Sequence, residues 1–100
     1  MPYTQQEIKQ RLEPIFMSFP IKKVVLFGSY AKGTQTAKSD IDLMIDSDGQ
    51  IRGIEFFGVL EIVTNALEID VDLIEASQII IGSRVHREIL DTGVVIYECA

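Results

Sequence analysis

A run of four apolar residues, Val24 to Phe27, stops at Gly28 and constrains the fold more than any other feature of the chain. A strand that is apolar on both faces is typical of the interior of a sheet that is covered on both sides. Helical patterns lie before and after it in the sequence. The capping-box residues Thr4 to Glu7 begin one of them, and apolar residues at helical spacing form another between residues 54 and 67. The pattern therefore predicts a central sheet with helices packed against it.

Helices and strands are expected to alternate along the whole chain. Helices are predicted over residues 4–19, directly after Gly28, over 54–67 and over 84–90, and strands over 21–27, 40–46, 70–74 and 94–97. This order is typical of the α/β or α+β class. Apolar residues make up 47% of the 100 residues, so residues 1–100 are predicted to form a single domain with its own core.

Charge is distributed unevenly along the chain, and its pattern limits the classes of molecule that the chain is expected to bind. Residues 1–39 contain six Lys or Arg and two Asp or Glu, a balance of +4, whereas residues 40–100 contain three and thirteen, a balance of −10. The basic residues form no stripe interleaved with aromatic residues, so direct nucleic-acid binding is not expected. No apolar run approaches the roughly 20 residues that span a membrane, and no signal-peptide pattern is visible. The only cysteine is Cys99, which suits a reducing compartment, so a cytoplasmic protein without membrane contact is predicted.

The residues that carry chemistry lie on either side of a ten-residue spacer. Gly28 ends the apolar strand, where a residue without Cβ allows a turn and the close approach of a ligand. Ser29 opens the next helix, whose unpaired N–H groups and dipole favour an anion, and its hydroxyl can add a hydrogen bond. Asp40 and Asp42 are two residues apart on a predicted strand, so both carboxylates are expected on one face. Such a pair can hold Mg²⁺, which often completes its shell with phosphate oxygens.

A third carboxylate lies on a later predicted strand. Asp72 alternates there with Val71 and Leu73, and it can face the same pocket if this strand pairs beside residues 40–46. Asp70 would take this place only if the register shifted by two residues. Three carboxylates would suit one or two divalent cations, with Asp72 assisting the deprotonation of an attacking hydroxyl. The arrangement indicates phosphoryl or nucleotidyl transfer.

At these positions the sequence resembles a known family. Leu26 to Gly33, Ser39 to Leu43 and Val71 to Leu73 look like the motifs of a minimal nucleotidyltransferase of the polymerase-beta-like superfamily. The resemblance covers nearly the whole chain and implies a nucleotidyltransferase fold, with a mixed four-stranded sheet and helices packed against it. It also implies the use of Mg²⁺, or alternatively Mn²⁺, with a nucleoside triphosphate that is expected to be ATP.

The resemblance also implies roles for individual residues. The catalytic and metal-binding residues are expected to be Asp40, Asp42 and Asp72, and the nucleotide-binding residues Gly28, Ser29, Lys32 and Ser39. Members of the family often carry Arg where this chain has Tyr30 and Lys32. The positive charge beside the phosphates is therefore expected from Lys32 and Lys38.

Many minimal members of this family look like antitoxins that inactivate a HEPN-domain ribonuclease toxin by attaching AMP to a tyrosine. The resemblance therefore implies AMP transfer to a hydroxyl and a HEPN-domain partner. A domain of 100 residues that binds phosphate and metal also has little surface left to enclose a base and an acceptor, so a complex with this partner, a homodimer or both is expected. Phe57, on the wide apolar surface of the 54–67 helix, is the expected contact. Two alternatives stay open: transfer to a small hydroxylated molecule, and a non-catalytic module that neutralises a partner by contact.

Overall fold

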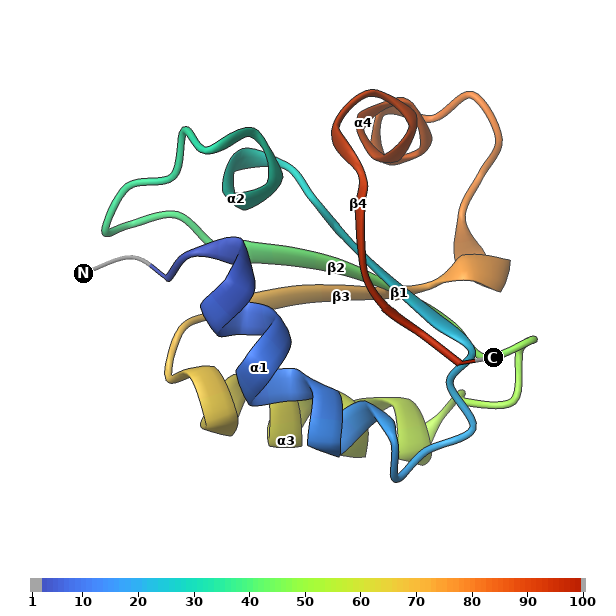
Figure 1. Cartoon of the computed structure of the whole chain (residues 1–100). Coiled ribbons are helices and arrows are strands. Elements are labelled where there is room, and N and C mark those ends of the chain that lie inside the picture. The colour runs from blue at the N-terminus through green and yellow to red at the C-terminus, as the bar shows by residue number, and fades with distance from the viewer. Residues whose placement is uncertain (1–2, 100) are drawn as a thin grey trace.

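The computed structural model describes residues 3–99, which form four α-helices, one short 3₁₀ helix and four strands (Figure 1). In chain order these are α1 (Gln5–Phe16), β1 (Lys23–Phe27), α2 (Ser29–Lys32), β2 (Ile41–Asp46), α3 (Ile54–Leu67), β3 (Val71–Glu75), η1 (Ala76–Gln78), α4 (Arg84–Thr92) and β4 (Val94–Glu98). The predicted alternation of helices and strands is confirmed, and η1 is an addition to it. Among the described residues, no helix is long and apolar enough to cross a bilayer.

The strands form one mixed sheet in the order β3-β2-β1-β4. β1 is antiparallel to both β2 and β4, whereas β2 and β3 are parallel. Parallel neighbours need a crossover connection, which α3 supplies between β2 and β3. The mixed four-stranded sheet and the interior position of the apolar strand β1 are therefore confirmed.

The two faces of the sheet are covered unequally. Helices α1 and α3 pack together under one face, and α4 lies over the other (Figure 1). Val24 and Leu26 of β1 are fully buried in the main core on the first face. On the second face, Val25, Phe27 and Met44 form a smaller cluster against α4. Because side chains alternate along a strand, Asp42 and Asp72 share this less completely covered face.

All four strands differ from their expected bounds by one or two residues, and the differences in β2 and β3 concern the site. β2 begins at Ile41, so Asp40 lies just before the strand, and β3 covers residues 71–75 instead of 70–74. Asp70 still supports the pairing, because its carbonyl accepts a hydrogen bond from the Ile41 N–H at 3.0 Å. The register pairs Asp42 with Asp72, as the prediction without a shift requires.

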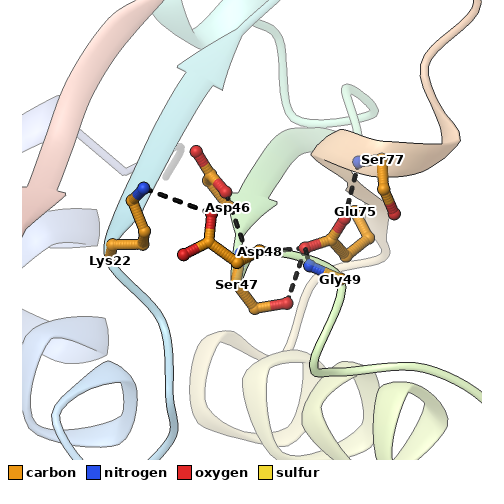
Figure 2. A network of polar contacts seen from close by, with 7 residues as sticks. All are labelled: Lys22, Asp46, Ser47, Asp48, Gly49, Glu75 and Ser77. Carbon is orange, nitrogen blue, oxygen red and sulfur yellow. Dashed lines mark hydrogen bonds and ion pairs between the residues drawn. The ribbon is translucent and has the colours of Figure 1, made fainter.

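A buried carboxylate fixes the end of β3 to the turn after β2 (Figure 2). Glu75 is 3% exposed and accepts hydrogen bonds from the Ser47 N–H (2.8 Å), the Ser47 hydroxyl (2.5 Å), the Gly49 N–H (3.3 Å) and the Ser77 N–H (2.6 Å). Burial alone would raise the pKa of Glu75, but the donors from Ser47 and Ser77 outweigh it and lower the pKa to about 2. The network ties β2 to β3 in the register that aligns the site.

Candidate active site

Asp42 and Asp72 form a carboxyl pair on adjacent parallel strands. They are register partners of β2 and β3, and neighbouring strands lie about 4.8 Å apart, so the two side chains stand next to each other on one face. The fold thus brings together two of the three predicted carboxylates.

Asp42 holds a proton more tightly than an ordinary aspartate does. Burial raises the pKa of Asp42 to about 6, and the charge of Asp72 and its hydrogen bond add to the increase. Smaller contributions come from the charges of Glu88 and Asp40. Asp42 therefore keeps its proton up to about pH 6 when no cation lies beside it. A divalent cation would compete directly with that proton.

Gly28 makes room for the pair at the end of β1. Its φ of 74° and ψ of −150° lie in a region that is essentially restricted to glycine. A Cβ at this position would overlap Oδ2 of Asp42 and lie 3.2 Å from its Cγ. The Gly28 N–H donates to the Thr92 hydroxyl at 3.0 Å, so it is already used. The glycine therefore provides space for Asp42, and its own N–H already has an acceptor within the protein.

The other predicted nucleotide-binding residues lie in α2 and in the loop before β2. Ser29 begins α2, and its hydroxyl makes no hydrogen bond to any residue between 3 and 99. Lys32 is exposed in the last turn of α2. The Ser39 hydroxyl instead accepts a hydrogen bond from the Thr36 N–H at 2.9 Å, which braces the loop before β2. Ser29 and Lys32 are thus available to a ligand, whereas Ser39 has a structural contact.

The donor set suits a hard divalent cation together with phosphate. No three His, Cys, Asp or Glu side chains of residues 3–99 converge closely enough to hold an ion by themselves. Asp42 and Asp72 supply oxygen ligands, while Asp40 is exposed and must turn inward to join them. Mg²⁺ is commonly held by one or two carboxylates, with water and phosphate oxygens completing its shell. The pair therefore fits Mg²⁺ bound along with a nucleotide.

Two α4 residues that the sequence analysis missed complete the surroundings. The Thr92 hydroxyl, which accepts from Gly28, also donates to the Glu88 carbonyl at 2.7 Å. The Glu88 side chain accepts a hydrogen bond from Nε of Arg84 at 3.4 Å and adds to the raised pKa of Asp42. Gly28 and Thr92 are 64 positions apart, so no local motif signals their contact. Only the packing of α4 on the sheet brings them together.

The carboxyl pair opens onto a hollow of about 480 Å³. It is lined from five elements by residues that include Asp42, Asp72, Phe57, Arg84 and Glu88. Its size lies within the range of small-molecule sites. The arrangement can therefore hold a cation and phosphates at a site that a second reactant can approach.

Comparisons with known proteins found a family profile that matches the chain and proteins with similar sequences. The sequence profile of the family described as "Polymerase beta, Nucleotidyltransferase" matches residues 10–99. A predicted protein adenylyltransferase of Methanocaldococcus jannaschii is 34% identical over 84 residues, which cover 77% of this chain and 79% of that protein.

Two solved structures share the fold. One is a toxin–antitoxin crystal structure with AMP-PNP, matched with a TM-score of 0.76 and 23% identity over 91% of this chain and 73% of that chain. The other contains the tri-AMPylated HEPN toxin of Shewanella oneidensis in complex with its MNT antitoxin. That match has a TM-score of 0.71 and 20% identity over 96% of this chain and 74% of that chain. At these identities the likeness establishes the fold.

Proposed function

Because the chain belongs to the polymerase-beta nucleotidyltransferase family, we propose that it transfers AMP from ATP to a hydroxyl group with the help of Mg²⁺. The acceptor in this proposal is a tyrosine of a HEPN-domain toxin, whose antitoxin the chain would be. The observation that carries the proposal is the Asp42–Asp72 pair beside the turn at Gly28 and Ser29. It puts ligands for a cation next to a helix start that favours phosphate.

In this proposal the aspartates bind the ion, and Asp72 also accepts a proton. Asp42 and Asp72 would hold the ion, with Asp40 joining them as a third ligand. When bound, Mg²⁺ neutralises phosphate charge and polarises the phosphoryl group. The acceptor oxygen attacks the α-phosphorus while its proton passes to the Asp72 carboxylate. A new O–P bond forms, the bond to pyrophosphate breaks, and pyrophosphate leaves with the electron pair.

The residues around α2 would hold the triphosphate. Ser29 supplies its uncommitted hydroxyl and the helix start, and Lys32 supplies positive charge. Tyr30, where relatives often carry Arg, is 2% exposed and packs into the main core, so it offers no phosphate contact. Ser39 acts indirectly by ordering the loop that leads to Asp40.

The outer side of α3 would provide the contact with the partner protein or with a second copy of the chain. Ile54 is 92% exposed and Phe57 is 67% exposed on this helix. The likeness to the MNT antitoxin in its complex with a HEPN toxin supports an assembly of this kind. Exposed apolar side chains that gather on one surface are typical of protein–protein contacts.

Mass spectrometry of the proteins that co-purify with the chain tests this function. We expect one partner to gain AMP when ATP and Mg²⁺ are both added, and no gain when either is omitted. AMP found on a small hydroxylated acceptor, with the partner unmodified, would favour the small-molecule alternative. A partner that stays bound and unmodified in every condition would favour neutralisation by contact alone.

A further inference from the structure

β3 is an edge strand, and within residues 3–99 nothing pairs with its outer side. The hydrogen bond from the Ile41 N–H to the Asp70 carbonyl fixes the direction of the backbone groups along the strand. In such a ladder alternate residues direct both their N–H and their C=O toward the neighbouring strand. Asp72 therefore bonds to β2, whereas the N–H and C=O groups of Val71 and Leu73 point away from the sheet.

The residues of this outer edge line two hollows that adjoin along β3. The hollow of about 480 Å³ at the carboxyl pair shares Phe56, Phe57, Leu73 and Ile74 with a second hollow of about 660 Å³ farther along β3. The helix α3 forms one wall of the combined groove, and η1 and α4 contribute to the other. The groove therefore runs along the open edge of β3 and ends at Asp72.

We propose that the acceptor is an extended polypeptide segment that adds to the outer edge of β3 as a further strand and places its hydroxyl residue opposite Asp72. This inference rests on the proposed function and specifies how the acceptor is presented. An open strand edge is a template for strand addition, and a polypeptide carries the alternating N–H and C=O groups that Val71 and Leu73 can pair with.

The geometry of an added strand explains why the hydroxyl would reach the site. Register partners on adjacent strands direct their side chains to the same face, about 4.8 Å apart. A residue of the added strand paired with Asp72 therefore directs its side chain to the face that carries the carboxyl pair. Its neighbours in the segment would point to the other face, where Phe56 and Phe57 of α3 form an apolar wall. The sheet edge would thus set which hydroxyl reacts.

Amide hydrogen exchange of the full chain tests the docking step without requiring turnover. The probe is a pool of nonapeptides with a central tyrosine and randomised flanks, compared with the same pool N-methylated on alternate backbone nitrogens. We expect the unmodified pool to slow exchange at Val71 and Leu73 at least tenfold. The amide of Asp72, which already bonds to β2, should change little, and the N-methylated pool should have no effect. Equal protection by both pools, or no protection at a saturating concentration, would overturn the proposal.

A matched pair of variants tests the same edge during AMP transfer. Val71→Pro removes an outward N–H at the first residue of an edge strand, where proline is tolerated, and Val71→Ala removes the same side chain but keeps the N–H. With Mg²⁺ and ATP, transfer to the peptide pool should be at least tenfold lower for Val71→Pro than for Val71→Ala. Transfer within twofold for the two variants would contradict strand addition. If Val71→Pro does not fold, strand addition is tested with the unaltered chain instead, by comparing AMP transfer to the unmodified pool with transfer to the N-methylated pool.

The two experiments also separate this inference from the proposed function. If the proposed function is wrong, no condition yields an AMP-modified acceptor, while the exchange experiment still reports whether a strand docks on β3. If the function is right and the docking mode is wrong, N-methylated and unmodified peptides receive AMP equally well.

Discussion

The carboxylate of Asp42 occupies the space that a side chain on Gly28 would need. Gly28 directly follows β1, Asp42 lies near the start of β2, and the two strands are antiparallel neighbours. The contact couples the turn at Gly28 to the carboxyl pair. Changing the turn must disturb the carboxylate.

We expect Gly28→Ala to abolish AMP transfer and to destabilise the fold. Its φ of 74° and ψ of −150° cost an alanine roughly 1–3 kcal/mol, and the new Cβ would also displace Asp42. Gly33→Ala is the matched control, because Gly33 also has a positive φ of 78° but a Cβ there would meet nothing within 4 Å. It should cost only about 1 kcal/mol and retain transfer. Equal activity of the two variants would show that the contact does not matter.

The stability of the metal-free protein should depend on pH through Asp42. Its pKa of about 6 in the folded state lies above the ordinary value of 3.8, so the folded state favours the protonated form. Its contribution to stability is therefore fully present below pH 3.8 and is lost as the pH rises through about 6. After allowance for partial exposure, we expect a loss of about 1–2 kcal/mol.

Urea unfolding in the presence of a chelator at pH 5 and pH 8 measures this pH dependence of stability. Asp42→Asn cannot ionise, so it should be more stable than the unaltered chain at pH 8, with a smaller difference at pH 5. The stabilisation by Mg²⁺ and ATP should weaken below pH 6, because the proton then competes with the cation. A less stable Asp42→Asn variant at pH 8 would exclude a strained carboxyl pair.

Thr92 is expected to position the turn at Gly28. Thr92→Val keeps the shape of the side chain but leaves the buried Gly28 N–H without its acceptor, at a cost of about 1–3 kcal/mol. Thr92→Ser keeps the hydroxyl and should restore transfer to within about threefold, whereas Thr92→Val should lose at least tenfold. Rates measured below the melting temperature of each variant distinguish positioning from unfolding. Similar rates for the two variants would assign the hydroxyl a structural role only.

Glu75 is expected to contribute stability without taking part in transfer. Glu75→Ala leaves the Ser47 and Ser77 donors without their acceptor and should cost roughly 2–4 kcal/mol. Its pKa of about 2 lies below the ordinary value, so this stability is present above pH 4.5 and is lost as the pH falls toward 2. Thermal melting at pH 7 and pH 3 measures both effects, with the exposed Glu61→Ala as the control. Equal melting temperatures for the two variants at pH 7 would contradict the assigned role.

Local patterns were sufficient to predict much of the fold and part of the candidate site. The alternation of Val71, Asp72 and Leu73 gave the correct face for Asp72 once β3 paired with β2 in parallel. The apolar run before Gly28 identified an interior strand, because both of its faces had to be covered. The first inference depends on a period of two residues and the second on an unbroken apolar run, and a sequence displays both directly.

The contributions of α4 could not be predicted in the same way. The placement of Thr92 and Glu88 depends on how an amphipathic helix rotates and slides on the sheet, which side-chain packing decides. The position of Asp40 just outside β2 depends on where a single hydrogen bond, from Ile41 to Asp70, begins the ladder. A strand end of this kind has no sequence signal that is accurate to one residue.

AMP transfer with labelled ATP tests the central claim most directly. The chain, its co-purified partner and Mg²⁺ are incubated with ATP labelled at the α- or the γ-phosphate, and the label on the partner is measured. Asp42→Asn is compared with Asp46→Asn, a change on the same face of the same strand but away from the carboxyl pair. We predict label from α-labelled ATP only, retained by Asp46→Asn and reduced roughly a hundredfold or more by Asp42→Asn. Label from γ-labelled ATP, or equal transfer by the two variants, would contradict the account.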